Sequence, residues 1–392
     1  MINERMLGLG KEPSAIRQLY AYGLQRKAQV GDENVYDLSI GNPSIPAPAA
    51  VRGRIEELLE MAPEVLHGYS MAAGLMEVRE AVADNLKRRF GIPATAANVY
   101  MTAGATSALD IVFSAITQPG EQVIVNAPHF PEYKVFIETA GAECVRVPMR
   151  PDNFQLDIEA LDAAIVPQTA AVVINSPNNP VGCVYTAATI QALADLMTRK
   201  EAEFGHPIYL ISDEPYREIT YGVEVPFPAS YYRDTIVCYS WAKSLSLPGE
   251  RIGYVYVSDK MPNAADVSAA VAGAGRALGN VCAPVLFQRV VQVCADEPSD
   301  VDAYARNRAI LTQGLDELGY EYIEPDGAFY LWVRALEDDA QAFSDKAKAH
   351  DLLVVASDSF GVGGWVRASY CVSPETIEGS LKAWKALKAD YE

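Results

Sequence analysis

Short apolar runs alternate with longer amphipathic stretches from about residue 98 to about residue 257. Apolar runs bounded by polar or proline-marked turns are typical of buried strands, and apolar positions repeating every 3.6 residues are typical of helices. Helices are predicted at 105–117 and 187–204. Strands are predicted at 98–102, 122–126, 171–175, 209–213, 235–240 and 253–257. This alternation predicts an α/β protein with a mostly parallel central sheet flanked by helices.

The pattern changes near residue 290. A long charged helix is predicted at about 299–318, a strand at 327–333, a helix at 339–349 and an apolar run at 353–355. These elements indicate a smaller α+β domain. At the other end, an amphipathic helix near 14–30 precedes the extended sequence DLSIGNPSIP. We therefore expect an N-terminal segment (1–45) that packs with the small domain, a large domain (46–285) and a C-terminal small domain (286–392).

Composition narrows the class of protein. The net charge of −19 argues against nucleic acid or an anionic membrane as a partner. The six cysteines are scattered without a CxxC pair, which favours a reduced, cytoplasmic protein over a disulfide framework. The four histidines are far apart and show no metal-ligand spacing. Nothing in the sequence is long and apolar enough to be a signal peptide or a membrane span, so we expect neither.

Polar residues stand at the ends of the predicted strands. Ligands of open parallel sheets bind outside the carboxyl ends of the strands, so these positions predict one binding site. The positions are Gly104, Asn126, Asn179, Asp213 and Ser240.

Lys243 follows a buried strand within a run of small and apolar residues. Partial desolvation there would lower its pKa, and such a lysine can form an imine and carry a proton. Ser240 and Arg251 flank it with a hydroxyl and a cation, both suited to a phosphate. The alternative for this segment alone is a surface lysine in a loop.

Three further features each have an ordinary alternative. Asp213 is followed three residues later by Tyr216, and its carboxylate could pair with a protonated ring nitrogen. The alternative is that Asp213 is a helix N-cap. The loop 175–182 is rich in turn residues and reads equally well as a plain turn. The junction 102–107 joins a strand to a helix with small residues and hydroxyls, so it is a candidate phosphate cup. It is neither a P-loop nor a dinucleotide fingerprint.

In their order along the chain, these motifs resemble those of the fold-type I, class I aminotransferases, and most of all the aspartate aminotransferase-like members. The resemblance covers essentially the whole chain, with Val181 and Asp358-Ser359 as departures in loops. The matching motifs are Ser240-x-x-Lys243 with Arg251, Asn179-Pro180-x-Gly182, Asp213-x-x-Tyr216, Gly104-Ala105-Thr106 and the glycine-rich approach to Arg367.

The resemblance implies pyridoxal 5′-phosphate (PLP) as the cofactor, held as a Schiff base on Lys243. Asp213 would hold the pyridine nitrogen protonated, and Asn179 and Tyr216 would bond the phenolic oxygen of the ring. Phe130 would stack on the ring, unless it is plain core. The cofactor phosphate would be received by Gly104, Ala105, Thr106, Ser240 and Arg251.

The resemblance also implies a homodimer, in which Tyr69 reaches the phosphate of the neighbouring subunit; its alternative is an ordinary packing residue. Gly41, Asn179 and Arg367 would bracket the α-carboxylate of the substrate, although Arg367 alone would also suit a surface strand. Thr106 stands where one branch of aspartate aminotransferases carries a lysine that reads a distal carboxylate. Arg276, contributed by the partner subunit, would bind the distal carboxylate in place of that lysine. The alternative is that Arg276 is a surface or interface cation.

The implied activity is a ping-pong transfer of an amino group from an L-amino acid to a 2-oxo acid, with aspartate or a broad range of amino acids as donors. One alternative is elimination with the same cofactor, as in C–S β-lyases, or a cyclopropane-forming synthase. Another is a regulatory module of the same fold. Such modules carry an N-terminal DNA-binding domain, for which motifs beginning near residue 38 leave no room.

Overall fold

The computed structural model describes residues 2–392 and is built around a seven-stranded sheet with the strand order β2-β8-β7-β6-β5-β3-β4. Only β8 runs antiparallel to its neighbours, so the prediction of an α/β fold with a mostly parallel sheet is confirmed. The strands are β2 (Val99–Thr102), β3 (Gln122–Ala127), β4 (Glu143–Pro148), β5 (Thr169–Asn175), β6 (Tyr209–Asp213), β7 (Thr235–Ser240) and β8 (Gly253–Val257).

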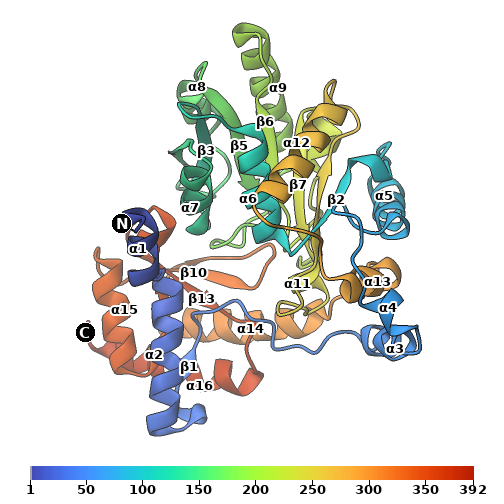
Figure 1. The fold of residues 1–392 in the computed structure, drawn as a ribbon. Helices are drawn as coiled ribbons and strands as arrows, with labels where there is room; N and C mark the ends of the chain where they lie inside the picture. Colours follow the sequence, from blue (N-terminus) through green and yellow to red (C-terminus); the bar gives the residue numbers. More distant parts are fainter. Residues whose placement is uncertain (1) are drawn as a thin grey trace.

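Helices cover both faces of this sheet (Figure 1). Successive side chains of a strand point to opposite faces. In β5, Val172 and Ile174 therefore pack with helices α8 (Ile158–Ala164) and α9 (Ala187–Phe204). Ala171 and Val173 pack with helices on the other face. Those helices are α6 (Ala105–Ile116), α7 (Glu132–Thr139) and α12 (Ala264–Ala277).

Four helices and one 3-10 helix lie near the β2 and β8 edge of the sheet, and one further short helix contacts α9 and β7. Helices α3, α5 and α13 share one apolar cluster with residues of β2, β7 and β8. The elements are α3 (Ala49–Leu58), α4 (Pro63–Leu66), α5 (Met76–Phe90), η2 (Ala96–Asn98), α10 (Pro228–Tyr231) and α13 (Val285–Cys294). Because α13 packs with this group, we place the boundary between the large unit and the C-terminal unit after α13. The predicted division at residue 285 itself stays a prediction.

The C-terminal part forms a four-stranded antiparallel sheet with the order β12-β13-β10-β9, covered by three helices. Its core is aromatic, with Phe343, Tyr370 and Trp384 fully buried. The elements are α14 (Val301–Leu318), β9 (Tyr322–Ile323), β10 (Tyr330–Arg334), α15 (Ala340–Ala349), β12 (Val355–Ala356), η3 (Ser357–Phe360), β13 (Trp365–Ser369) and α16 (Pro374–Ala389).

The N-terminal segment pairs with this C-terminal unit. It contains α1 (Glu4–Lys11), α2 (Ala15–Val30), η1 (Asp32–Asn34) and β1 (Tyr36–Asp37). Strand β1 pairs in parallel with β11 (Leu352–Leu353), far away in sequence. The chain then crosses from β1 towards α3 on the large unit (Figure 1).

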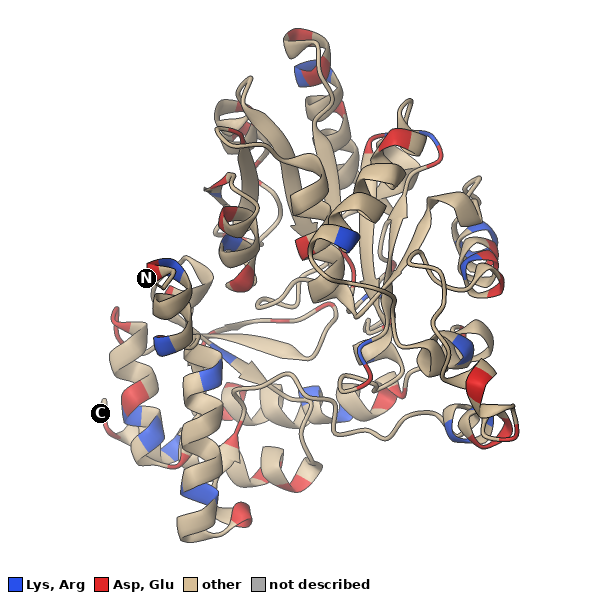
Figure 2. Cartoon of the chain, viewed as in Figure 1, with Lys and Arg blue, Asp and Glu red and all other residues tan. Residues whose placement is uncertain are grey.

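Acidic residues outnumber basic ones by 51 to 32, and both kinds stand mainly on the outer helices and loops (Figure 2). All six cysteines are free, and four of them are buried. Within residues 2–392, no helix combines the length and the apolar character needed to cross a bilayer.

Candidate active site

A cavity of about 240 Å³ opens at the carboxyl ends of β5, β6 and β7. The predicted site residues that line it come from both units and from the N-terminal segment. They are Gly41, Ala105, Thr106, Phe130, Asn179, Asp213, Tyr216, Ser240, Lys243, Arg251 and Arg367.

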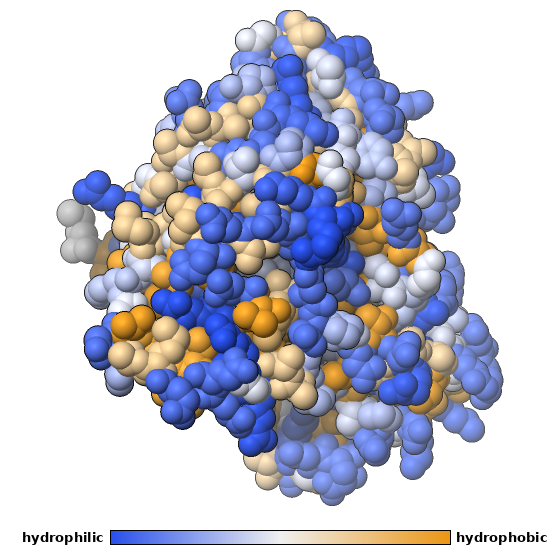
Figure 3. Space-filling view, turned by 90° about the vertical axis from the view of Figure 1, so that its right-hand side faces the viewer, coloured by the Kyte–Doolittle hydropathy of each residue, from blue (hydrophilic) through white to orange (hydrophobic). Residues whose placement is uncertain are grey.

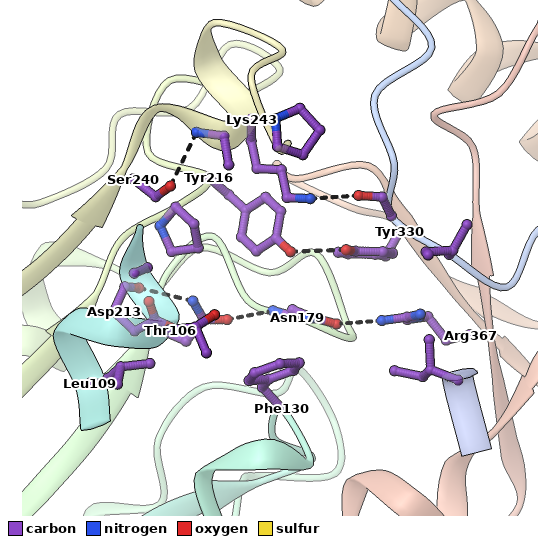
Figure 4. Close-up of a pocket in the computed structure, with 18 of the residues that line it drawn as sticks. Thr106, Leu109, Phe130, Asn179, Asp213, Tyr216, Ser240, Lys243, Tyr330 and Arg367 are labelled. Carbon is purple, nitrogen blue, oxygen red and sulfur yellow. Dashed lines mark hydrogen bonds between the residues drawn. The ribbon is translucent and has the colours of Figure 1, made fainter. Parts of the chain in front are cut away.

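Lys243 lies in the short helix α11 (Trp241–Ser244), directly after β7. The side chain of Ser240 caps this helix by accepting the backbone N–H of Ala242 at 3.1 Å. The Nζ atom of Lys243 points into the cavity and donates to the carbonyl oxygen of Gly41 at 2.5 Å (Figure 4). The pKa of Lys243 is lowered to about 8, chiefly by burial, with Cys371 opposing the shift and the cations of Arg251 and Arg367 adding to it. The neutral amine is therefore accessible close to physiological pH.

Asp213 ends β6 with its carboxylate buried at the base of the cavity. The Tyr133 hydroxyl donates to its Oδ2 atom at 2.6 Å, whereas the buried Oδ1 atom has no hydrogen-bond partner. Burial raises the pKa of Asp213 to about 7, and the Tyr133 hydrogen bond opposes that rise. The sequence analysis missed Tyr133. It stands three residues after Phe130, in the first turn of α7, and this proximity was the available signal.

The loop after β5 is buried throughout and is fixed by asparagine side chains. The Oδ1 atom of Asn175 accepts the backbone N–H of Asn179 at 2.6 Å, and its Nδ2 atom donates to the carbonyl oxygen of Asp213 at 2.9 Å. The Oδ1 atom of Asn179 in turn accepts from Nη1 of Arg367 at 2.9 Å. This segment is therefore an ordered wall of the cavity rather than a surface turn.

The N-terminus of α6 and the Arg251 guanidinium form one end of the cavity. Gly104 caps α6 with a φ of 85°, and a Cβ atom there would lie 2.8 Å from Nη2 of Arg251. Gly104 itself does not line the cavity, but it lets the guanidinium approach the helix. Thr106 is in the first turn of α6. Free backbone N–H groups, a helix dipole and a guanidinium together suit a phosphate group.

Arg367 lies at the opposite side of the cavity from Asp213, on β13 (Figure 4). It is almost completely buried, and its Nη2 atom donates to the carbonyl oxygen of Ser39 at 2.6 Å, while its Nε atom has no partner. The ring of Tyr330 lies 4.4 Å from the guanidinium. A buried guanidinium with an unused N–H is suited to a carboxylate.

Tyr330 is a second cavity residue that the sequence analysis missed. Its hydroxyl is 2.9 Å from that of Tyr216, so it joins the Arg367 region to the Lys243 region. A Cβ atom on Gly41 would lie 2.0 Å from the Tyr330 hydroxyl, which explains the glycine at this position.

Four predicted residues do not line this cavity: Gly104, Asn126, Tyr69 and Arg276. Tyr69 is 88% exposed and lines a shallow depression together with Gly249 and Arg251. Arg276 is exposed in the last turn of α12. Phe130, by contrast, lines the cavity and contacts Tyr133 edge-on, with the ring centroids 5.6 Å apart.

Comparisons with known proteins show the family of this chain. The family model described as Aminotransferase class I and II matches residues 33–383. The chain belongs to this family. The aspartate/prephenate aminotransferase of Thermus thermophilus is 32% identical to this aminotransferase, with 95% of each chain covered. The aromatic-amino-acid aminotransferase 2 of Thermococcus litoralis is 29% identical, with 96% of each chain covered. A crystal structure of an aminotransferase from Eubacterium rectale superposes with a TM-score of 0.97 at 52% identity, covering 100% of this chain and 99% of that one.

The aminotransferase is therefore a PLP-dependent enzyme of fold type I, and nothing found favours the elimination alternative. Its residues fit the cofactor. The free Oδ1 atom of Asp213 is a buried acceptor suited to a ring N–H. Gly104 and Arg251 form a cradle suited to the phosphate, and Lys243 supplies a buried amine.

Proposed function

We propose that this aminotransferase transfers amino groups by a ping-pong reaction in which Lys243 is the catalytic amine and Arg367 binds the α-carboxylate of the substrate. The observation that supports this proposal most directly is that the Lys243 amine, with its pKa lowered to about 8, and the unpaired Oδ1 atom of Asp213 belong to one cavity. When bound, PLP supplies an aldehyde that condenses with amines and a ring that accepts electrons.

The side chains around the cavity would then orient the bound cofactor and polarise its ring. Asp213 would bind the ring N–H through Oδ1, and Tyr216 and Asn179 would bond the phenolic oxygen. Phe130 would cover one face of the ring and exclude water from it. Ala105, Thr106, Ser240 and Arg251 would hold the phosphate, with Gly104 allowing the close approach of Arg251.

Arg367 and Lys243 would act on different parts of the substrate. The α-carboxylate would accept hydrogen bonds from the guanidinium, beginning with the unpaired Nε atom. The neutral Lys243 amine would remove the proton from the α-carbon. Its lowered pKa favours this role because an ordinary lysine amine is almost fully protonated at neutral pH.

We further propose that the enzyme works as a homodimer and that Tyr69 completes the phosphate site of the partner. The support is the position of Tyr69, which is 88% exposed beside Arg251. Apolar side chains are also exposed in this part of the molecule, among them Met71 at 79% and Val281 at 62%. Figure 3 shows hydrophobic patches on the face that carries α3 and α5.

The amino donor is proposed to come from a broad range of amino acids. The names of the relatives include aspartate, prephenate and aromatic amino acids, so they do not single out one side chain. Arg276 remains a candidate reader of a side-chain carboxylate from the partner subunit.

The test is a half-reaction screen. The enzyme loaded with PLP is mixed with each of the twenty amino acids in turn, and the absorbance change of the cofactor and the 2-oxo acid formed are measured. Lys243→Ala should lose turnover and the absorbance of the covalently held cofactor, whereas Lys382→Ala, at an exposed position of α16, should behave like the wild type. Retained amino transfer in Lys243→Ala, or release of pyruvate and ammonia from cysteine without an oxo-acid acceptor, would contradict the proposal.

A further inference from the structure

Tyr216 and Tyr330 meet inside the cavity, although they come from different units of the molecule (Figure 4). Tyr216 follows β6 of the large sheet, whereas Tyr330 is the first residue of β10 in the C-terminal sheet. Their hydroxyl oxygens are 2.9 Å apart, and either hydroxyl can donate to the other. The direction of this hydrogen bond decides what the pair does to a bound cofactor.

Packing fixes the position of the Tyr330 hydroxyl. The side chain is almost completely buried, and its ring centroid lies 5.1 Å from that of Phe329 and 5.6 Å from that of Tyr216. On Gly41, a Cβ atom would lie only 2.0 Å from the hydroxyl oxygen. Among the described residues 2–392, Tyr216 is the only hydrogen-bond partner of this oxygen. Any effect of the Tyr330 hydroxyl as a donor or an acceptor therefore passes through Tyr216.

The charges around the pair set the direction of the hydrogen bond. The Arg367 guanidinium lies 4.4 Å from the centre of the Tyr330 ring. Burial raises the pKa of Tyr330 to about 12, and the Arg367 cation opposes this rise. Burial also raises the pKa of Tyr216 well above its usual value, and the Asp213 carboxylate adds to that rise. Hydroxyl dipoles orient in such a field with the hydrogen away from the cation, so Tyr330 donates and Tyr216 accepts.

Two other titratable groups lie near the pair, and neither reverses this direction. Burial raises the pKa of the Cys371 thiol to about 11, so the thiol is uncharged at neutral pH. The Nζ atom of Lys243 donates to the carbonyl oxygen of Gly41, and in the proposed function this nitrogen is bound to the cofactor. The Tyr216 hydrogen is thus left free to point at the phenolic oxygen of the cofactor.

We propose that Tyr330 is a positioning residue, which donates to Tyr216 and thereby directs and strengthens the hydrogen bond from Tyr216 to the phenolic oxygen of the cofactor. This inference rests on the proposed function, in which Tyr216 bonds that oxygen. Consecutive hydrogen bonds polarise one another, so the loss of the first weakens the second.

The first test is a pH titration of the absorbance of the Lys243-bound cofactor. A hydrogen bond to the phenolic oxygen stabilises its negative charge, and the stabilised oxygen holds the proton of the neighbouring Lys243 nitrogen less tightly. Tyr330→Phe should therefore raise the pH midpoint of the absorbance change by about 0.5–1 pH unit, the effect of one neutral hydrogen bond. The matched control is Tyr320→Phe, which removes a buried hydroxyl of the same unit that donates to the carbonyl oxygen of Trp384 at 2.9 Å. Its midpoint should equal that of the wild type.

A double variant shows whether Tyr330 acts through Tyr216. Tyr216→Phe should raise the midpoint by more than Tyr330→Phe does. Adding Tyr330→Phe to Tyr216→Phe should raise it no further, because the Tyr330 hydroxyl has already lost its acceptor. A further rise in the double variant, as large as that of Tyr330→Phe alone, would show that Tyr330 acts by another route and would overturn the inference.

Acetate binding to the PLP-loaded enzyme separates the hydroxyl from the ring. Tyr330→Phe keeps a ring over the Arg367 guanidinium and should bind acetate as the wild type does. Tyr330→Leu loses the ring and should bind acetate about 3-fold more weakly or worse, the effect of a lost cation–π contact. If Tyr330→Phe bound acetate as poorly as Tyr330→Leu, the hydroxyl would support Arg367 instead of Tyr216, and the inference would be wrong.

The failure of this inference and that of the proposed function give different results. If the wild type forms no cofactor absorbance band that Lys243→Ala lacks, the proposed function fails. If that band forms and responds to pH in the same way in the wild type and in Tyr330→Phe, or in neither, only the positioning role of Tyr330 fails.

Discussion

The two carboxylate oxygens of Asp213 differ because only one of them accepts a hydrogen bond, from the hydroxyl of Tyr133. The Tyr133 hydroxyl takes Oδ2 at 2.6 Å and leaves Oδ1 available within the cavity. Because a hydrogen bond to a carboxylate favours its ionised form, Tyr133 opposes the effect of burial on the pKa of Asp213.

Tyr133→Phe should therefore weaken PLP binding about 10-fold, since a hydrogen bond to a charged group contributes about 1.5–3 kcal/mol. Removal of the hydrogen bond raises the pKa of Asp213 above about 7, so the defect relative to wild type should be larger at pH 6.5 than at pH 9. Equilibrium titration of the cofactor-free protein with PLP at both pH values measures it.

The control for this variant is Tyr232→Phe. It also removes a buried hydroxyl, one that donates to the carbonyl oxygen of Ile208 at the other end of the sheet. Equal losses of PLP affinity in the two variants, or a defect in Tyr133→Phe that does not depend on pH, would mean that Tyr133 acts only through folding.

Local motifs made most of the cavity predictable, and long-range contacts made the rest unpredictable. Asp213 ends a strand, Lys243 and Asn179 follow strands, and strand ends converge at one edge of a parallel sheet. Tyr133 reaches Asp213 across 80 residues of chain, and Tyr330 reaches Tyr216 across 114. No local pattern records such a pairing.

At the scale of elements, the turn from β2 into α6 depends on a residue without a side chain. Gly104 has a φ of 85°, and a Cβ atom would crowd the Arg251 guanidinium at 2.8 Å. Gly205, the C-cap of α9, has a similar φ of 75° but open space around its missing Cβ atom.

This pair separates backbone strain from crowding. Gly104→Ala and Gly205→Ala both force a side chain onto a backbone with positive φ. Gly205→Ala, at a left-handed position with a ψ of 20°, should destabilise the fold by about 1 kcal/mol, and Gly104→Ala, whose ψ of 175° lies in a region that glycine alone commonly adopts, by about 1–3 kcal/mol. Only Gly104→Ala should also displace Arg251 and weaken PLP binding, by about 10-fold or more. Thermal melts of the cofactor-free proteins and PLP titrations measure the two effects. Unaltered PLP affinity in Gly104→Ala would show that Arg251 does not need this approach.

The strands that the sequence predicts most accurately are those buried on both faces of the sheet. The strands β5, β7 and β8 are buried on both faces, and their continuous apolar runs gave bounds within two residues of those in the structure. The edge strand β4 has a single buried residue, Val147, among exposed and partly buried ones, and it was missed. The apolar run 353–355 became two short strands, β11 and β12, because the chain leaves β1 there and joins β13.

At the scale of the whole molecule, the proposed exchange of Tyr69 between subunits has a specific consequence for mixed dimers. Lys243→Ala and Tyr69→Ala homodimers should both be impaired, the first completely. In a mixed dimer, the subunit that keeps Lys243 would receive an intact Tyr69 from its partner, and the other subunit would lack both. Mixing and reassociation should therefore restore up to half of the wild-type activity per mixed dimer.

Activity of the mixture no higher than the average of the two parents would indicate that Tyr69 serves its own subunit or has no role in the site. Sedimentation of each parent protein and of the mixture checks that dimers have formed. A wild type that sediments as a monomer with full activity would contradict the homodimer directly.

The anchors of the cavity belong to different parts of the chain. Asp213 ends a strand of the large sheet and Lys243 lies in the short helix that follows another, whereas Arg367 and Tyr330 lie on strands of the C-terminal sheet. Any tilt of one sheet against the other therefore changes the span between the carboxylate anchor and the reactive nitrogen. Substitutions in α14, which packs on α16 of the C-terminal unit, would then slow or speed turnover by changing this tilt, while every side chain of the cavity stays the same.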